Sequence, residues 1–208
     1  MVLTSSSTKI WRTSIFQSSL IDISLRIIGI SLIVVLLVYA YPRFYSSLLE
    51  APNYSLIDEF KGGNTIGFRY AYVGAWMLIV SQLYVFLKYF VKYFKIRFKL
   101  ARWLDIHCIL NTTGFTLVIL HAGFPYSFRY WEPFTRLNIL GGLEGLIGIR
   151  GLLTWLLIFA LASGFLNRYG GSPRLKWVSS KLHFYTILAV YVSASIHILL
   201  SILLPEKS

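Results

Sequence analysis

The sequence of 208 residues is 56% hydrophobic and only 13% charged, and its mean hydropathy is +0.66. Soluble globular domains carry roughly twice that share of charged residues. The composition therefore excludes a soluble globular domain and predicts an integral membrane protein in contact with lipid. The formal charge of +12 does not indicate a nucleic-acid partner, because the basic residues lie beside apolar runs and form no recognition motif.

Five runs are long and apolar enough to cross a hydrocarbon layer about 30 Å thick, which takes about 20 helical residues. In chain order they cover residues 21–41, 70–90, 103–123, 147–166 and 177–203. Helices satisfy their own backbone polar groups in lipid, and few residues are left outside the runs. The sequence therefore predicts an all-α integral membrane fold, a single transmembrane domain over residues 1–208 with five transmembrane helices.

Lysine and arginine gather in three of the segments that flank these runs. They are Lys9 and Arg12; Lys88, Lys92, Lys95, Arg97, Lys99 and Arg102; and Arg168, Arg174, Lys176 and Lys181. The other two links hold few basic residues. Because basic residues concentrate in cytoplasmic loops, we expect a cell-membrane protein with its N-terminus in the cytoplasm and its C-terminus outside.

All four histidines of the chain lie in the third and fifth runs, in two pairs with equal spacing. The differences 121 − 107 and 197 − 183 both equal 14. On an α-helix this interval is about 21 Å of rise and returns to within about 40° of the same direction. His107 and His121 therefore share a face with one residue in each leaflet, and so do His183 and His197.

The predicted topology makes the third and fifth spans parallel, so the histidines pair by depth. His107 and His183 form an inner pair, and His121 and His197 form an outer pair. Imidazoles that face each other across a helix bundle are natural axial ligands of iron. The pattern predicts a haem-binding helix bundle with two bis-histidine b-type haems, and these four residues as the metal ligands. The only cysteine, Cys108, excludes covalent haem attachment through C-x-x-C-H.

Three further residues are candidates for holding the haems. Gly114 lies midway between His107 and His121, where the lack of a side chain leaves room for a flat macrocycle. Arg168 and Arg150 end the fourth span on its inner and outer sides, where each is a candidate partner for a haem propionate. Both arginines are equally consistent with interfacial side chains that extend toward the membrane surface.

The motifs Trp103-x3-His107-x13-His121, then GFLNRY at 164–169, then Leu182-His183-x13-His197 resemble the haem-binding core of ferric-reductase-like and NADPH-oxidase-like membrane cytochromes. The LHAGF and ALASGFLNRY stretches are similar to the stand-alone b-type cytochrome subunits of respiratory oxidoreductases. This resemblance covers about the last hundred residues, and it implies transmembrane electron transfer through two stacked haems. No flavin- or nicotinamide-binding domain follows the last span, so electrons are expected to arrive from another protein.

The expected function is that of a b-type dihaem cytochrome subunit, an electron-transport component of a respiratory or redox complex. It carries electrons between the quinone pool and a partner oxidoreductase subunit, with a quinone as a further candidate ligand near Glu144 and Arg150. Whether the chain is itself an enzyme stays open. Two alternatives stay open as well: a self-contained transmembrane reductase of ferric iron, oxygen or superoxide, and a haem-free metal or proton transporter or structural subunit.

Overall fold

A computed structural model describes residues 5–50, 65–95, 97–122 and 143–203, without the side chains of residues 5–20, 143–148 and 150. Within these ranges every regular element is an α-helix, as predicted. The helices are α1 (Ser5–Leu49), α2 (Thr65–Ser81), α3 (Leu83–Phe94), α4 (Leu100–His121), α5 (Leu143–Tyr169) and α6 (Pro173–Leu203).

Five segments of the described chain are long and apolar enough to cross a membrane, which confirms the predicted number of spans. They are Ile21–Leu49, Thr65–Phe94, Leu100–His121, Gly151–Tyr169 and Pro173–Leu203. The second span contains both α2 and α3. Large apolar side chains are exposed on each of these spans, including Val35, Ile109 and Val192. A surface of this kind requires lipid, so the protein is a multi-pass membrane protein.

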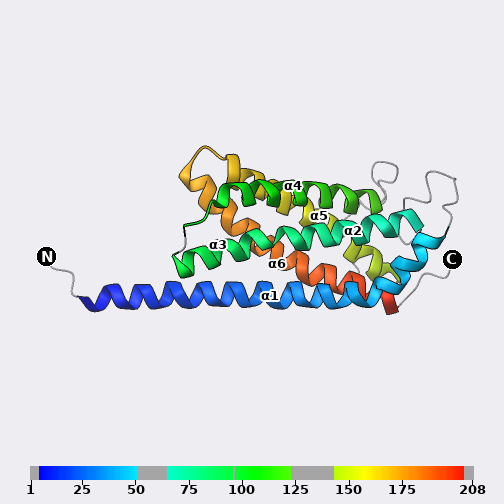
Figure 1. The fold of residues 1–208 in the computed structure, drawn as a ribbon, viewed down its shortest axis with the longest axis horizontal. Coiled ribbons are helices and arrows are strands. Elements are labelled where there is room, and N and C mark those ends of the chain that lie inside the picture. The colour runs from blue at the N-terminus through cyan, green and yellow to red at the C-terminus, as the bar shows by residue number, and fades with distance from the viewer. Residues whose placement is uncertain (1–4, 51–64, 96, 123–142, 204–208) are drawn as a thin grey trace.

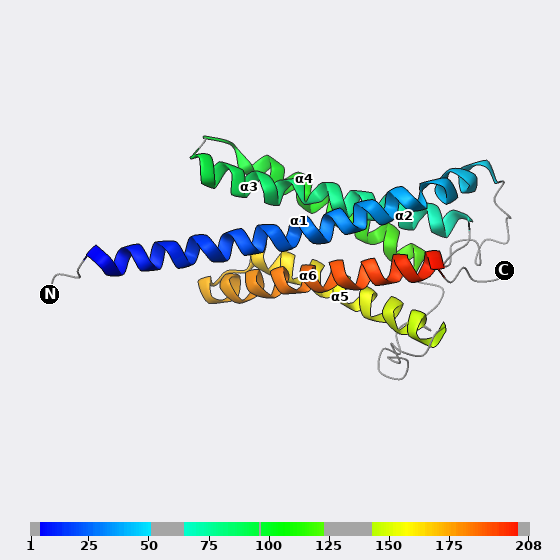
Figure 2. The same cartoon turned by 90° about the horizontal axis from the view of Figure 1, so that it is seen from below.

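The direction of the helices agrees with the predicted topology. In Figures 1 and 2, α1, α4 and α6 run one way along the molecule, and α2, α3 and α5 run back. The link between α3 and α4 and the link between α5 and α6 therefore lie at the same end, together with the start of α1. The parallel arrangement of α4 and α6, on which the pairing of the histidines depends, is confirmed.

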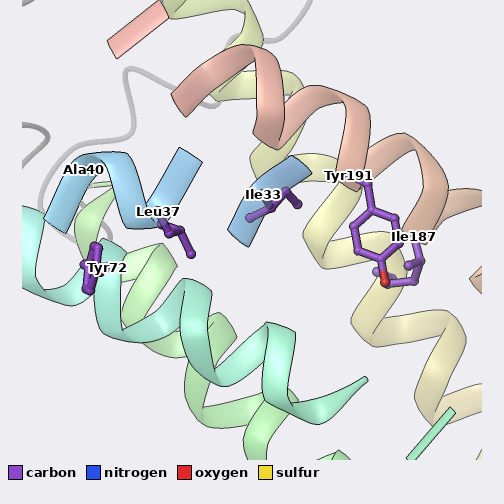
Figure 3. Packing of buried hydrophobic residues seen from close by; sticks show 7 residues of the cluster. Ile33, Leu37, Ala40, Tyr72, Ile187 and Tyr191 are labelled. Carbon is purple, nitrogen blue, oxygen red and sulfur yellow. The ribbon is translucent and has the colours of Figure 1, made fainter. Parts of the chain in front are cut away.

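Two helix pairs and one bridging helix make up the bundle. Helix α4 packs along α2, and α6 packs along α5, whereas α4 touches α5 only over a short stretch. Helix α1 joins the two pairs, as Figure 2 shows. Its side chains enter a core with residues from both pairs (Figure 3): Ile33, Leu37, Ala40, Tyr72, Ala160, Ile187 and Tyr191.

Gly114 lies where α4 crosses α2, which gives it a packing role between the two helices. A Cβ atom at Gly114 would lie 2.9 Å from the carbonyl oxygen of Gly74, and a Cβ at Gly74 would lie equally close to the carbonyl of Gly114. The two glycines allow the backbones to approach, as small residues do between membrane helices. The space that a side chain at Gly114 would occupy is thus filled by α2, and room for a macrocycle beside Gly114 stays a prediction.

Candidate functional site: four intramembrane histidines

The break between α2 and α3 leaves a backbone carbonyl free inside the membrane. The amide of Val85 donates to Gln82 O at 2.9 Å, so it does not serve Ser81 O as it would in a continuous helix. Ser81 Oγ and Gln82 Nε2 both donate back to Leu78 O, at 2.6 and 3.4 Å. These bonds satisfy the polar side chains and leave Ser81 O as an acceptor.

His107 uses this acceptor. Its Nδ1 lies 2.8 Å from Ser81 O, and because a carbonyl only accepts, Nδ1 must carry the proton. Asn111, one turn further along α4, donates to His107 O at 2.7 Å, and its Oδ1 lies 3.1 Å from Ser81 Oγ. The ring of Tyr84 lies 5.2 Å from the imidazole, centroid to centroid. The imidazole is therefore fixed in the tautomer with Nε2 unprotonated.

His183 is held in the same manner on the other helix pair. Its Nδ1 donates to Ala160 O of α5 at 2.9 Å. The hydroxyl of Ser163 donates to the same carbonyl at 3.0 Å, which leaves its oxygen, 3.3 Å from Nδ1, as a second acceptor. Gly164 makes room for the ring, because a Cβ there would lie 3.3 Å from His183 Cε1. Nε2 of His183 is again the nitrogen with a free lone pair.

The outer histidines come together across α4 and α6. His121 Nδ1 donates to Gly67 O of α2 at 3.1 Å. The ring centroids of His121 and His197 are 6.4 Å apart, and the ring planes differ by 59°. Two imidazoles that bind one metal ion from opposite sides, with metal–nitrogen bonds of about 2 Å, have centroids roughly 6 to 6.5 Å apart. The observed separation fits that arrangement.

The inner histidines lie on either side of Arg26, whose Nη1 is 3.5 Å from Oε1 of Gln82, the residue after Ser81, and whose guanidinium lies over the ring of Phe184, the residue after His183. His121 and His197 meet as the equal spacing predicts, and the pairing of His107 with His183 stays a prediction. Helices α4 and α6, which carry them, are not among the helix pairs with extended backbone contact. The histidine side chains thus project from α4 and α6 between the two helix pairs.

The two arginines predicted to hold propionates fare differently. Arg168 forms an ion pair with Asp105 of α4, and its Nη1 donates to Cys108 Sγ at 3.0 Å. Its charge is compensated by a protein carboxylate and it links α4 to α5, while its role at a propionate stays a prediction. The side chains of Arg150 and Glu144, the candidates near the outer end, lie outside the described residues.

A buried arginine that the sequence reasoning overlooked lies beside the inner pair. Arg26 of α1 is only 7% exposed, and it contacts Gln82 and the ring of Phe184, the residues that follow Ser81 and His183. The hydroxyl of Tyr191, a residue equally buried on α6, lies near it. A signal was available in the sequence, because an arginine in the middle of an apolar run marks a functional site by default.

The fold and the site define an all-α, multi-pass membrane protein with two pairs of intramembrane histidines. No three His, Cys, Asp or Glu side chains of the described ranges form a cluster that could hold a bare metal ion. A haem needs no such cluster, because its iron takes only axial ligands from the protein. No protein-family model matches the chain, and neither does a curated protein or a solved structure. The resemblance to dihaem membrane cytochromes therefore stays a prediction.

Proposed function

We propose that the protein is a dihaem b-type cytochrome that carries electrons across the membrane, with His107 and His183 as ligands of an inner haem and His121 and His197 as ligands of an outer one. The observation that carries the proposal is the 6.4 Å separation of the His121 and His197 rings, two imidazoles on different helices at one depth. A polar side chain inside the membrane costs free energy, so intramembrane histidines usually mark a functional site. The geometry of this pair fits a shared iron.

The hydrogen bonds of the imidazoles support the same proposal. A histidine that binds a metal usually donates its other ring N–H to a carbonyl or carboxylate, which fixes the ring and raises the basicity of the ligand nitrogen. His107, His121 and His183 do so, with Ser81 O, Gly67 O and Ala160 O as acceptors. Each acceptor lies on the helix that packs beside the histidine's own, so each helix pair holds its own ligands in place.

A bound haem supplies one-electron chemistry, because its iron changes between the ferric and ferrous states. The protein contributes the axial nitrogens, excludes water by burial, and sets the local charge. Two sites about 21 Å apart along parallel helices lie in opposite leaflets and can carry an electron from one side of the membrane to the other. The end with the basic links is assigned to the cytoplasm, and the quinone pool and a partner oxidoreductase subunit are the proposed redox partners.

Absorption spectra of the purified protein test this function. We expect a b-type α-band on reduction with dithionite and two haems per chain in a pyridine haemochrome assay. Absence of the band in protein purified from cells supplied with haem would refute the proposal and favour a haem-free transporter or structural subunit. Rapid oxidation of the reduced protein by ferric iron or oxygen, with no partner present, would instead favour a self-contained reductase.

A further inference from the structure

Arg26 is a buried cation inside the membrane, and no described carboxylate forms an ion pair with it. Only 7% of its surface is exposed. In the part of the chain that the structure describes, no Asp or Glu forms an ion pair with it, although Asp22 lies one turn away on α1. An unpaired buried charge is strongly unfavourable, so an arginine at this place calls for an anionic partner beyond the described residues.

The surroundings of Arg26 orient its guanidinium and leave part of it unsatisfied. Its Nη1 lies 3.5 Å from Gln82 Oε1, and its central carbon lies 4.8 Å from the centroid of the Phe184 ring. Its Nε has no hydrogen-bond partner. Gln82 follows Ser81, which accepts the bond from His107, and Phe184 follows His183. The junction of α2 and α3 and helix α6 therefore position both the arginine and the inner histidine pair.

Tyr191 brings a second unsatisfied group to this place. Its side chain is 7% exposed, and its hydroxyl lies near enough to the Arg26 guanidinium to accept from it weakly, but the phenol O–H has no acceptor among the described residues. Its ring is held against Gly29 of α1, where a Cβ would come within 2.7 Å of Tyr191 Cδ2. Arg26 Nε and the phenol O–H of Tyr191 thus both lack an acceptor, and an oxygen ligand beside them would satisfy both.

We propose that Arg26 and Tyr191 bind a propionate carboxylate of the inner haem. The inference rests on the proposed haem function, since a haem is the ligand at this depth that brings carboxylates with it. An arginine and a phenol both donate to a carboxylate, and charge-assisted bonds of this kind are strong. The same positive charge stabilises the ferrous state of the adjacent iron, because reduction removes one positive charge from the haem. Arg26 is therefore a positioning residue that also raises the potential of one haem.

Redox titration of the full-length, haem-loaded protein tests the electrostatic part. Arg26→Gln should lower the midpoint potential of one haem and leave the other unchanged, while Arg26→Lys should retain most of the wild-type value. Arg43→Gln is the matched control, because Arg43 is an exposed arginine on the same helix. Tyr191→Phe, which removes one oxygen atom, should shift the same haem in the same direction by less. Identical potentials in wild type, Arg26→Gln and Tyr191→Phe would overturn the proposal.

Haem dimethyl ester, in which both propionates are esterified, tests the carboxylate itself. Arg26→Gln should weaken the uptake of protohaem at one of the two sites by about ten-fold or more, and should leave the uptake of the ester unchanged. Equal weakening for both compounds would show a merely structural arginine and would refute the pairing. A wild-type protein that takes up no haem contradicts the proposed function, whereas two haems with no effect at Arg26 contradict this inference alone.

Discussion

The imidazole of His121 lies with its ring centroid 6.4 Å from that of His197, although the two residues belong to different helix pairs. His121 is fixed by the carbonyl of Gly67 on α2, so its position does not depend on contact with α6. Each helix pair thus presents its own histidine at the outer depth. This arrangement leads to a direct prediction about haem content.

Replacing His121 or His197 with leucine should remove the outer haem alone. The inner ligands are held by Ser81 O and Ala160 O, which neither change touches. We expect about one haem per chain in the pyridine haemochrome assay, against about two in the wild type. His107→Leu and His183→Leu are the matched variants, and each should remove the other haem with a different shift in the α-band. Loss of both haems from any single change, at normal protein yield, would contradict two independently held sites.

Gly114 should be intolerant of any side chain. In Gly114→Ala the new Cβ would lie 2.9 Å from the Gly74 carbonyl, so α2 and α4 must separate. Overpacking of this kind costs about 1–3 kcal/mol. Thermal unfolding in detergent should show a lower Tm for Gly114→Ala. Gly171→Ala is the control, since a Cβ there meets no atom within 4 Å. Equal melting temperatures for both variants would show that the crossing is not tightly packed.

Much of the fold follows from the sequence, because hydrocarbon imposes simple rules on a chain. The number of spans and the parallel course of α4 and α6 depend only on apolar length and on the placement of lysine and arginine. The helix ends differ from prediction, as α1 continues to Leu49 and α4 begins at Leu100. Hydrophobicity marks where a helix enters lipid, but polar residues beyond that point can stay helical.

The candidate site was predictable only in part. The equal spacing of the histidines depends on helix geometry alone, and it predicted which residues would share a depth. The packing of Gly114 against α2 was not predicted, because the lack of a side chain does not reveal which neighbour uses the space. The acceptor at Ser81 arises from a break in the helix that no proline or glycine marks. Arg26 could have been found from its intramembrane position, but only the fold shows that no described carboxylate forms an ion pair with it.

The Arg168–Asp105 ion pair should stabilise the packing of α4 against α5 and should not affect the potentials of the haems. Both side chains are partly exposed, at 26% and 55%, so the ion pair is screened by water and salt. Arg168→Gln and Asp105→Asn should each lower the Tm slightly at low salt, and less at high salt. The midpoint potentials of both haems should stay at their wild-type values, unlike those of Arg26→Gln. A potential shift in Arg168→Gln but not in Asp105→Asn would show that Arg168 binds a propionate after all.

The orientation in the membrane can be tested with single cysteines, because Cys108 is the only natural one. In a Cys108→Ser background, Ser172→Cys places a thiol in the link between α5 and α6, and Glu50→Cys places one just beyond the opposite end of α1. If the basic end faces the cytoplasm, a membrane-impermeant maleimide added to intact cells should label Glu50→Cys and not Ser172→Cys. Inverted vesicles should give the reverse pattern, and the Cys108→Ser protein without an added cysteine should stay unlabelled. Labelling of Ser172→Cys in intact cells would place the basic links outside, and it would exchange the leaflets of the two proposed haem sites.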